Sequence, residues 1–258
     1  TGICRGCKPS NITTGFAGAG AYSDGKLSLS PDVGGNLPKY LGYSKTQDLI
    51  DYVDKMYLEF GADWKIYGID KEDGIRDIRK KAISGNLKLV ECPIRHMGTE
   101  EGYNIYSRIE KHLIKLGVEL SFRNPVKDLI FNDNNEINGV VADKEYYSKV
   151  VVAAVGREGS DWLRNICLQH NITVETGDID IGVRVETMYE SKLIYYSETF
   201  DDKVRTFCSN PGGEVSTEYY DNNLAVVNGH SYKSEELKSD NTNFALLVTK
   251  HFTKPFNS

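Results

Sequence analysis

Long apolar runs and an excess of basic charge are both missing from this 258-residue sequence. Its most apolar stretch, VVVAAVG at 150–156, is far shorter than the roughly 20 residues needed to span a bilayer. The net charge of −6 argues against general binding to nucleic acid or anionic membranes, because such binding needs basic surface. The first residues show no signal-peptide pattern. We therefore expect a cytoplasmic protein with no membrane and no nucleic-acid partner.

Cysteine is scarce, and its odd count of five is not typical of a secreted disulfide framework. Cys4 and Cys7 form a C-x-x-C pair of the kind found in zinc sites and redox centres. A closed zinc site needs four ligands, and no second such pair follows, so we predict no metal site. Free thiols, a metal site completed by residues outside the chain and a redox pair all stay open for these cysteines.

Glycine, in contrast, is concentrated near the start, in GFAGAGAYSDGKLSLSPDVGG at 15–35. Dense glycine indicates a backbone that approaches another group closely or adopts positive φ. The stretch follows no predicted strand and does not lead into a helix. It is therefore not the G-x-G-x-x-G turn that binds dinucleotides.

Apolar periodicity predicts three helices, at 44–60, 71–85 and 100–117. Ser44 or Thr46 is the expected cap of the first, and Gly61 its end. The third helix is predicted to turn four residues inward: Ile105, Ile109, Leu113 and Leu116.

Strands are predicted at 87–96, at 118–124, on both sides of the polar turn NDNNE, and at 150–155. The last is continuous and β-branched, which is typical of a parallel strand buried on both faces. It ends in a glycine turn, where open α/β sheets bind ligands. From 177 onward the segments are short, alternating and separated by turns, which indicates an antiparallel sheet.

Several motifs together carry a family resemblance, the longest being NITTGFAGAGAYSDGKLSLSPDVGG, PIRHMGT, AAVGREGSDWL, DIGVRVE and KVRTFCSNPGGEV. The chain resembles the bacterial uncharacterised FAD-dependent dehydrogenases, two-domain flavoproteins related to glutathione reductase and p-hydroxybenzoate hydroxylase. The resemblance implies an α/β plus antiparallel β fold. Residues 1–176 would form an incomplete FAD-binding domain with a helical segment at 40–90, and 177–258 part of a mainly β substrate-side domain. Because the G-x-G-x-x-G unit is missing, we expect an interior piece of a longer flavoprotein.

The resemblance also implies the site residues. Those expected beside FAD are Gly18, Gly20, Ser23, Asp24, Gly25, Lys26, Ala154, Gly156 and Arg157. A cation near the flavin favours the reduced anion, and Lys26, Arg157 and Arg95 are the candidates. The expected catalytic or substrate-holding residues are His96, Arg95, Arg184 and Arg205, with His230 as a further candidate. Cys208 is expected to be an inert core thiol.

We accordingly expect a fragment of an FAD-dependent oxidoreductase whose small-molecule substrate is unknown, with a nicotinamide or another electron partner. Without the pyrophosphate-binding turn, this chain alone is expected to be inactive and to bind FAD weakly. Two alternatives stay open: a non-catalytic flavoprotein-like scaffold and an RNA-modifying flavoprotein. The acidic net charge counts against the second.

Overall fold

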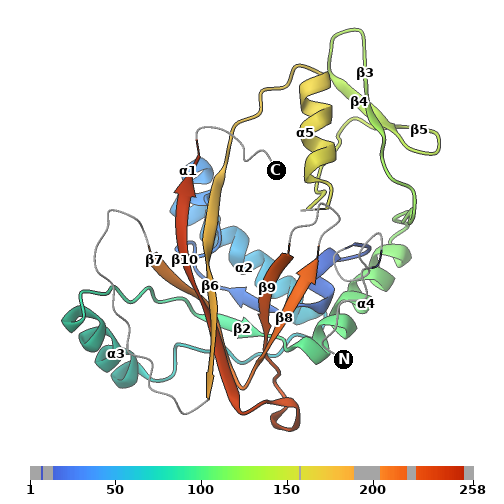
Figure 1. The fold of residues 1–258 in the computed structure, drawn as a ribbon. Coiled ribbons are helices and arrows are strands. Elements are labelled where there is room, and N and C mark those ends of the chain that lie inside the picture. Colours follow the sequence, from blue (N-terminus) through green and yellow to red (C-terminus); the bar gives the residue numbers. More distant parts are fainter. Residues whose placement is uncertain (1–6, 8–13, 157, 189–203, 220–224, 253–258) are drawn as a thin grey trace.

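The computed structural model of the protein describes residues 7, 14–156, 158–188, 204–219 and 225–252. These form a mixed α/β structure of helices and small antiparallel sheets (Figure 1). The α-helices are α1 (Leu37–Leu41), α2 (Tyr43–Glu59), α3 (Glu72–Ser84), α4 (Thr99–Lys115) and α5 (Ser160–Gln169), with short 3-10 helices η1 (Gly18–Tyr22) and η2 (Glu235–Leu237). None of these helices is long and apolar enough to cross a bilayer.

The described strands form four sheets, and every strand pair is antiparallel. In sheet order these are β1 (Lys26–Ser28) with β2 (Ile94–His96); β3 (Asp128–Phe131), β4 (Ile137–Val141) and β5 (Glu145–Tyr147); β6 (Asp178–Met188), β10 (Asn241–His251) and β7 (Val204–Pro211); and β8 (Glu214–Tyr219) with β9 (Ala225–His230). The predicted antiparallel region after 177 is therefore confirmed for the residues described, whereas KLIYYSETF at 192–200 lies outside them.

The three predicted helices are confirmed, but the predicted cap of the first is wrong. Helix α2 follows α1 through Gly42, whose φ of 78° reverses the chain, and no side chain caps it. The Thr46 hydroxyl instead donates back to the Gly42 carbonyl at 2.8 Å, inside the first turn of the helix. Gly61, with φ of 94°, lies just beyond the last helical residue, as predicted.

The strand predicted at 150–155 is not formed. The segment pairs with no described strand, and Val150 and Val152 are 72% and 81% exposed. A buried parallel strand needs a neighbour on each edge to satisfy its backbone groups, and no described residue supplies one. The strand predicted at 118–124 is also absent. The third strand of the sheet around the NDNNE turn is β5 and not the segment at 150–155.

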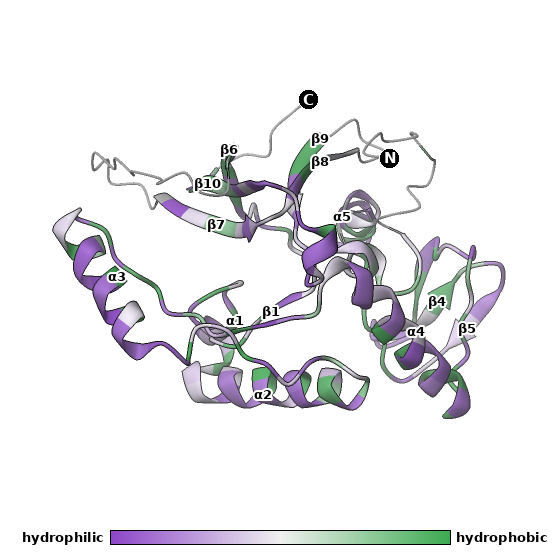
Figure 2. Ribbon diagram, turned by 90° about the horizontal axis from the view of Figure 1, so that it is seen from below, coloured by the Kyte–Doolittle hydropathy of each residue, from purple (hydrophilic) through white to green (hydrophobic). Residues whose placement is uncertain are grey.

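A small apolar core lies where α2 and α4 meet the β1–β2 pair. Its buried members are Ala62, Met97 and Ile105, packed by Leu27, Tyr57, Phe60 and Ile109. Leu116, predicted to face inward, is 67% exposed, because α4 ends at Lys115, beyond the reach of this core. Helix α3 stands apart from the body and is largely hydrophilic (Figure 2).

A buried ion pair fastens β2 to α2. The guanidinium of Arg95 is 2% exposed, and its Nε and Nη2 contact the Asp54 carboxylate at 2.6 and 2.8 Å. Its Nη1 donates to the Asp63 carbonyl. Three of its donors are thus used inside the fold, and these bonds fix the position of β2 along α2.

We expect Asp54→Asn to lower the free energy of unfolding by about 3 kcal/mol, because it leaves the buried Arg95 charge without its carboxylate. Asp73→Asn is the matched control, since Asp73 forms an exposed ion pair with Arg76. That change is expected to cost less than about 1 kcal/mol. Equal losses in urea denaturation of the two variants would contradict the structural role given to Arg95.

Candidate functional site

A cavity of about 1200 Å³ lies between three parts of the chain. One wall is the glycine-rich segment at 14–24, and a second is the segment at 151–156 together with the start of α5. The third wall comes from β7 and β9, through Cys208 and residues 228–230, while β3 and β4 contribute apolar side chains at one end. It is large enough for a cofactor-sized ligand.

This cavity brings together five of the predicted cofactor residues: Gly18, Ser23, Asp24, Ala154 and Gly156. Asp24 and Ala154 are 130 positions apart in the sequence. The unpaired conformation of 150–155 therefore does not remove Ala154 and Gly156 from the site.

Glycine opens the backbone to the cavity on both sides. Gly15 and Gly156 have φ of 96° and 61°, and a Cβ added to either would meet no atom within 4 Å. Gly18 and Ala17 also have positive φ, 51° and 63°. The open space at Gly15 and Gly156 lets a ligand approach the backbone closely, and side chains at these positions would fill the space that the ligand needs.

Gly20 and Gly25 have a different role from the open glycines. A Cβ on Gly20 would lie 3.1 Å from the Tyr106 hydroxyl, and one on Gly25 would collide with Met97. These two positions therefore let the segment lie close against α4 and β2, and they position the cavity wall without facing the ligand space.

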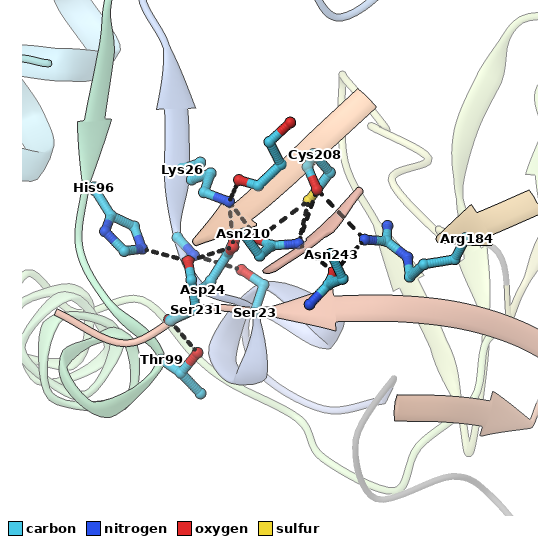
Figure 3. Close-up of polar contacts among 12 residues, drawn as sticks. Ser23, Asp24, Lys26, His96, Thr99, Arg184, Cys208, Asn210, Ser231 and Asn243 are labelled. Atoms are coloured by element: carbon cyan, nitrogen blue, oxygen red, sulfur yellow. Dashed lines mark hydrogen bonds and ion pairs between the residues drawn. The ribbon is translucent and has the colours of Figure 1, made fainter. Parts of the chain in front are cut away.

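A buried polar network fastens the glycine-rich wall to the C-terminal strands (Figure 3). The carboxylate of Asp24 is 2.9 Å from Lys26 Nζ and accepts the Ser231 hydroxyl at 3.1 Å. Lys26 also donates to the carbonyl of Ser209, at 2.9 Å, and to the amide oxygen of Asn210. Lys26 thus points to β7 and does not line the cavity as was expected of a residue that orients the flavin.

Ser231 also lies 3.1 Å from His96 Nε2. The single hydroxyl proton of Ser231 goes to Asp24, which accepts only, so His96 must donate from Nε2. The order of donation is His96 to Ser231 to Asp24, the reverse of a histidine base that activates a serine. Burial lowers the pKa of His96, which favours the neutral ring. His96 is therefore a hydrogen-bond donor that supports Asp24.

The structure does not gather the four predicted catalytic residues. Arg95 is bonded to Asp54 on the opposite face of β2 from His96. Arg184 donates to Val227 O at 3.2 Å and to Asn243 Oδ1 at 2.7 Å. Arg205 pairs with Asp180, and its guanidinium lies over the Phe207 ring. His96 connects to the cavity-lining Asp24 through Ser231, and Arg184 reaches the carbonyl of the cavity-lining Cys208 at 3.4 Å. Arg157 lies outside the described residues.

Three residues of the site were not predicted in these roles. Asn210 lies near the end of β7 and Ser231 directly after β9, and no sequence pattern distinguishes either from an ordinary polar residue. Cys208, expected in the core, is only half-buried and lines the cavity. Its φ of 52° belongs to a β-bulge, which the sequence pattern does not reveal.

The charged side chains that line the described walls of the cavity are acidic. Asp24 and Glu158 line it, and none of the described lining residues is a lysine or arginine. Among the residues that the structure describes, no three His, Cys, Asp or Glu side chains are grouped to hold a metal. Cys7 is exposed, and its partner in the C-x-x-C pair, Cys4, lies outside the described residues.

No protein-family model matches the chain. It is 25% identical over 260 residues to an uncharacterized protein of Clostridium beijerinckii, an alignment that covers 93% of this chain. The chain spans 41% of the length of that relative. The similarity is distant and extends along nearly the whole chain.

We expect the stability of the protein to fall as the pH drops below about 6.5, in part through His96. Burial lowers the folded-state pKa of His96 below the ordinary value of 6.5, so between the two values the unfolded state binds more protons. His96→Gln removes this titration and keeps a donor for Ser231. The variant should lose less free energy of unfolding between pH 7 and pH 5 than the wild type. Identical losses in the two proteins would show that His96 does not titrate in this way.

Proposed function

We propose that the protein is part of an FAD-dependent oxidoreductase and that its cavity holds the isoalloxazine ring. The observation that carries the proposal is the meeting of Gly18, Asp24, Ala154 and Gly156 on one cavity. These positions come from two motifs that the family resemblance assigns to the flavin. Nothing in either motif alone requires that the two lie side by side.

The walls suit a flat, largely apolar ring with polar edges. Apolar side chains of 151–155 and Trp162 line one side, and Ser23, Asn228 and His230 offer hydrogen bonds around the rest. The cavity volume of about 1200 Å³ exceeds that of a site for a single small ligand, so a substrate can lie beside the ring. The open glycines leave room for close contact with its face.

The phosphates of FAD fit this cavity less well than the isoalloxazine ring does. Cationic side chains are the usual partners of a pyrophosphate, whereas the described walls carry the carboxylates of Asp24 and of Glu158, which lies just before the N-terminus of α5. We infer that the phosphates and adenine are held outside the cavity, by a separate dinucleotide-binding unit.

FAD, when bound, supplies the hydride or electron transfer, and the residues of this chain orient and insulate it. Asp24, held by Lys26 and Ser231, keeps the glycine-rich wall in place. His96 holds its proton at Nε2, directed to Ser231. A nicotinamide or another electron carrier is the proposed partner, and the cytoplasm is the proposed location.

We expect this chain to bind riboflavin and FAD with dissociation constants within about fivefold of each other, because the ring makes most of the contacts. Quenching of the fluorescence of each flavin measures the two dissociation constants. Strong binding of FAD with none of riboflavin would place the site on the phosphates and contradict the proposal. Failure to bind either flavin would favour a scaffold without cofactor.

Thiol protection gives the position of the bound ring. Bound riboflavin should slow the reaction of Cys208 with a maleimide, because Cys208 lines the cavity. Cys7 is exposed and serves as the control within the same sample. Protection of neither cysteine by a saturating flavin would put the flavin at another place on the molecule.

A further inference from the structure

The wall of the cavity at Cys208 is a β-bulge. Strand β7 pairs with β10 through Asn210 opposite Asn243 and Phe207 opposite Ala245. Cys208 and Ser209 therefore face the single residue between Asn243 and Ala245, and Cys208 adopts φ of 52°. A non-glycine residue in this region costs free energy and needs surrounding contacts to hold it.

Those contacts converge on the side chain of Asn243 (Figure 3). Its amide oxygen accepts Arg184 Nη1 at 2.7 Å and Asn210 Nδ2 at 2.9 Å. The same two donors also reach the Cys208 carbonyl, Asn210 at 2.8 Å and Arg184 at 3.4 Å. Asn210 and Asn243 are both 0% exposed, so water does not replace these bonds from the surface.

The orientation of the Asn243 amide is fixed by its partners. A flipped amide would turn its NH₂ group toward two donors, so the oxygen must face Arg184 and Asn210. Its Nδ2 is buried and has no hydrogen-bond partner among the described residues. The amide oxygen of Asn243 therefore makes its hydrogen bonds to Arg184 and Asn210, and the amide nitrogen is dispensable for them.

The same cluster supports the second strand of this wall. Gly229 in β9 lines the cavity, and a Cβ at this position would collide with the side chains of Asn243, Asn210 and Arg184. Asn210 also accepts Lys26, the partner of Asp24 in the opposite wall. The cluster thus lies directly behind the β7–β9 wall and is bonded to the glycine-rich wall.

We infer that Asn243 is a positioning residue. Its amide oxygen holds the Cys208 bulge and the Gly229 strand in the positions that the ligand needs in this wall of the cavity. The effect of Asn243 on flavin affinity rests on the proposed function, whereas its effect on the position of Cys208 does not. Asn243 acts through Asn210 and Arg184 and does not itself line the cavity.

The test compares Asn243→Asp with Asn243→Leu. Aspartate keeps the accepting oxygen and replaces the unpartnered nitrogen with a second oxygen, whose negative charge lies beside the Arg184 guanidinium. Leucine removes the acceptor at similar size. We expect Asn243→Leu to raise the rate of Cys208 modification by maleimide about tenfold, and to weaken riboflavin binding about tenfold. Asn243→Asp should stay within about twofold of the wild type in both measurements. Peptide mass spectrometry identifies Cys208 among the thiols.

Asp54→Asn is the control for lost stability away from the cavity, and its Cys208 rate and riboflavin affinity should match the wild type. If Asn243→Leu does not fold, Asn243→Ser takes its place, because its shorter hydroxyl does not reach both donors. Wild-type Cys208 rates in the leucine or serine variant, with a melting temperature lowered as in Asp54→Asn, would overturn the inference. If the wild type binds no riboflavin, the proposed function fails, and the Cys208 rates still decide the role of Asn243.

Discussion

The carboxylate of Asp24 accepts from Lys26 and from Ser231, and these two contacts hold both sides of the cavity together. Asp24 is 7% exposed, so its charge is stable only because these donors surround it. Lys26 extends the connection to β7, and Ser231 extends it to His96 in β2. Further polar contacts join the loop after β9 to the start of α4, where Glu100 accepts the backbone N–H groups of Lys233 and Ser234. The glycine-rich segment is thus positioned by this network, together with the close packing of Gly20 and Gly25 against Tyr106 and Met97.

Local structure was predictable where it depends on local sequence. Helices α2, α3 and α4 follow apolar periodicity and glycine stops, and strands β6 to β10 follow alternation and turns. The segment at 150–155 shows the limit of such reasoning. Its composition is that of a buried parallel strand, but a strand forms only where another strand offers hydrogen bonds, and the described residues offer none. The division of the chain at 176 stays a prediction, as does the flavoprotein fold of the first part.

The candidate site was predictable to a similar extent. Glycines and a turn at 154–156 indicated which backbone approaches a ligand, and the cavity contains Gly18, Ala154 and Gly156. The roles of the charged residues were less predictable, because the sequence does not show whether an arginine or a lysine binds a substrate or an internal carboxylate. Arg95, with Asp54, and Lys26, with Asp24, both have internal partners. Asn243 was beyond prediction, since its role depends on a bulge and on Gly229, 14 positions earlier.

Hydrogen exchange with and without riboflavin tests most directly whether one ligand contacts both walls. We predict that saturating riboflavin slows exchange of backbone amides at 14–24 and at 151–156 together, and leaves α3 unchanged. Both segments line the cavity, so a ligand between them must protect both. Slower exchange in only one of the two segments, or in neither while riboflavin is bound, would contradict the account.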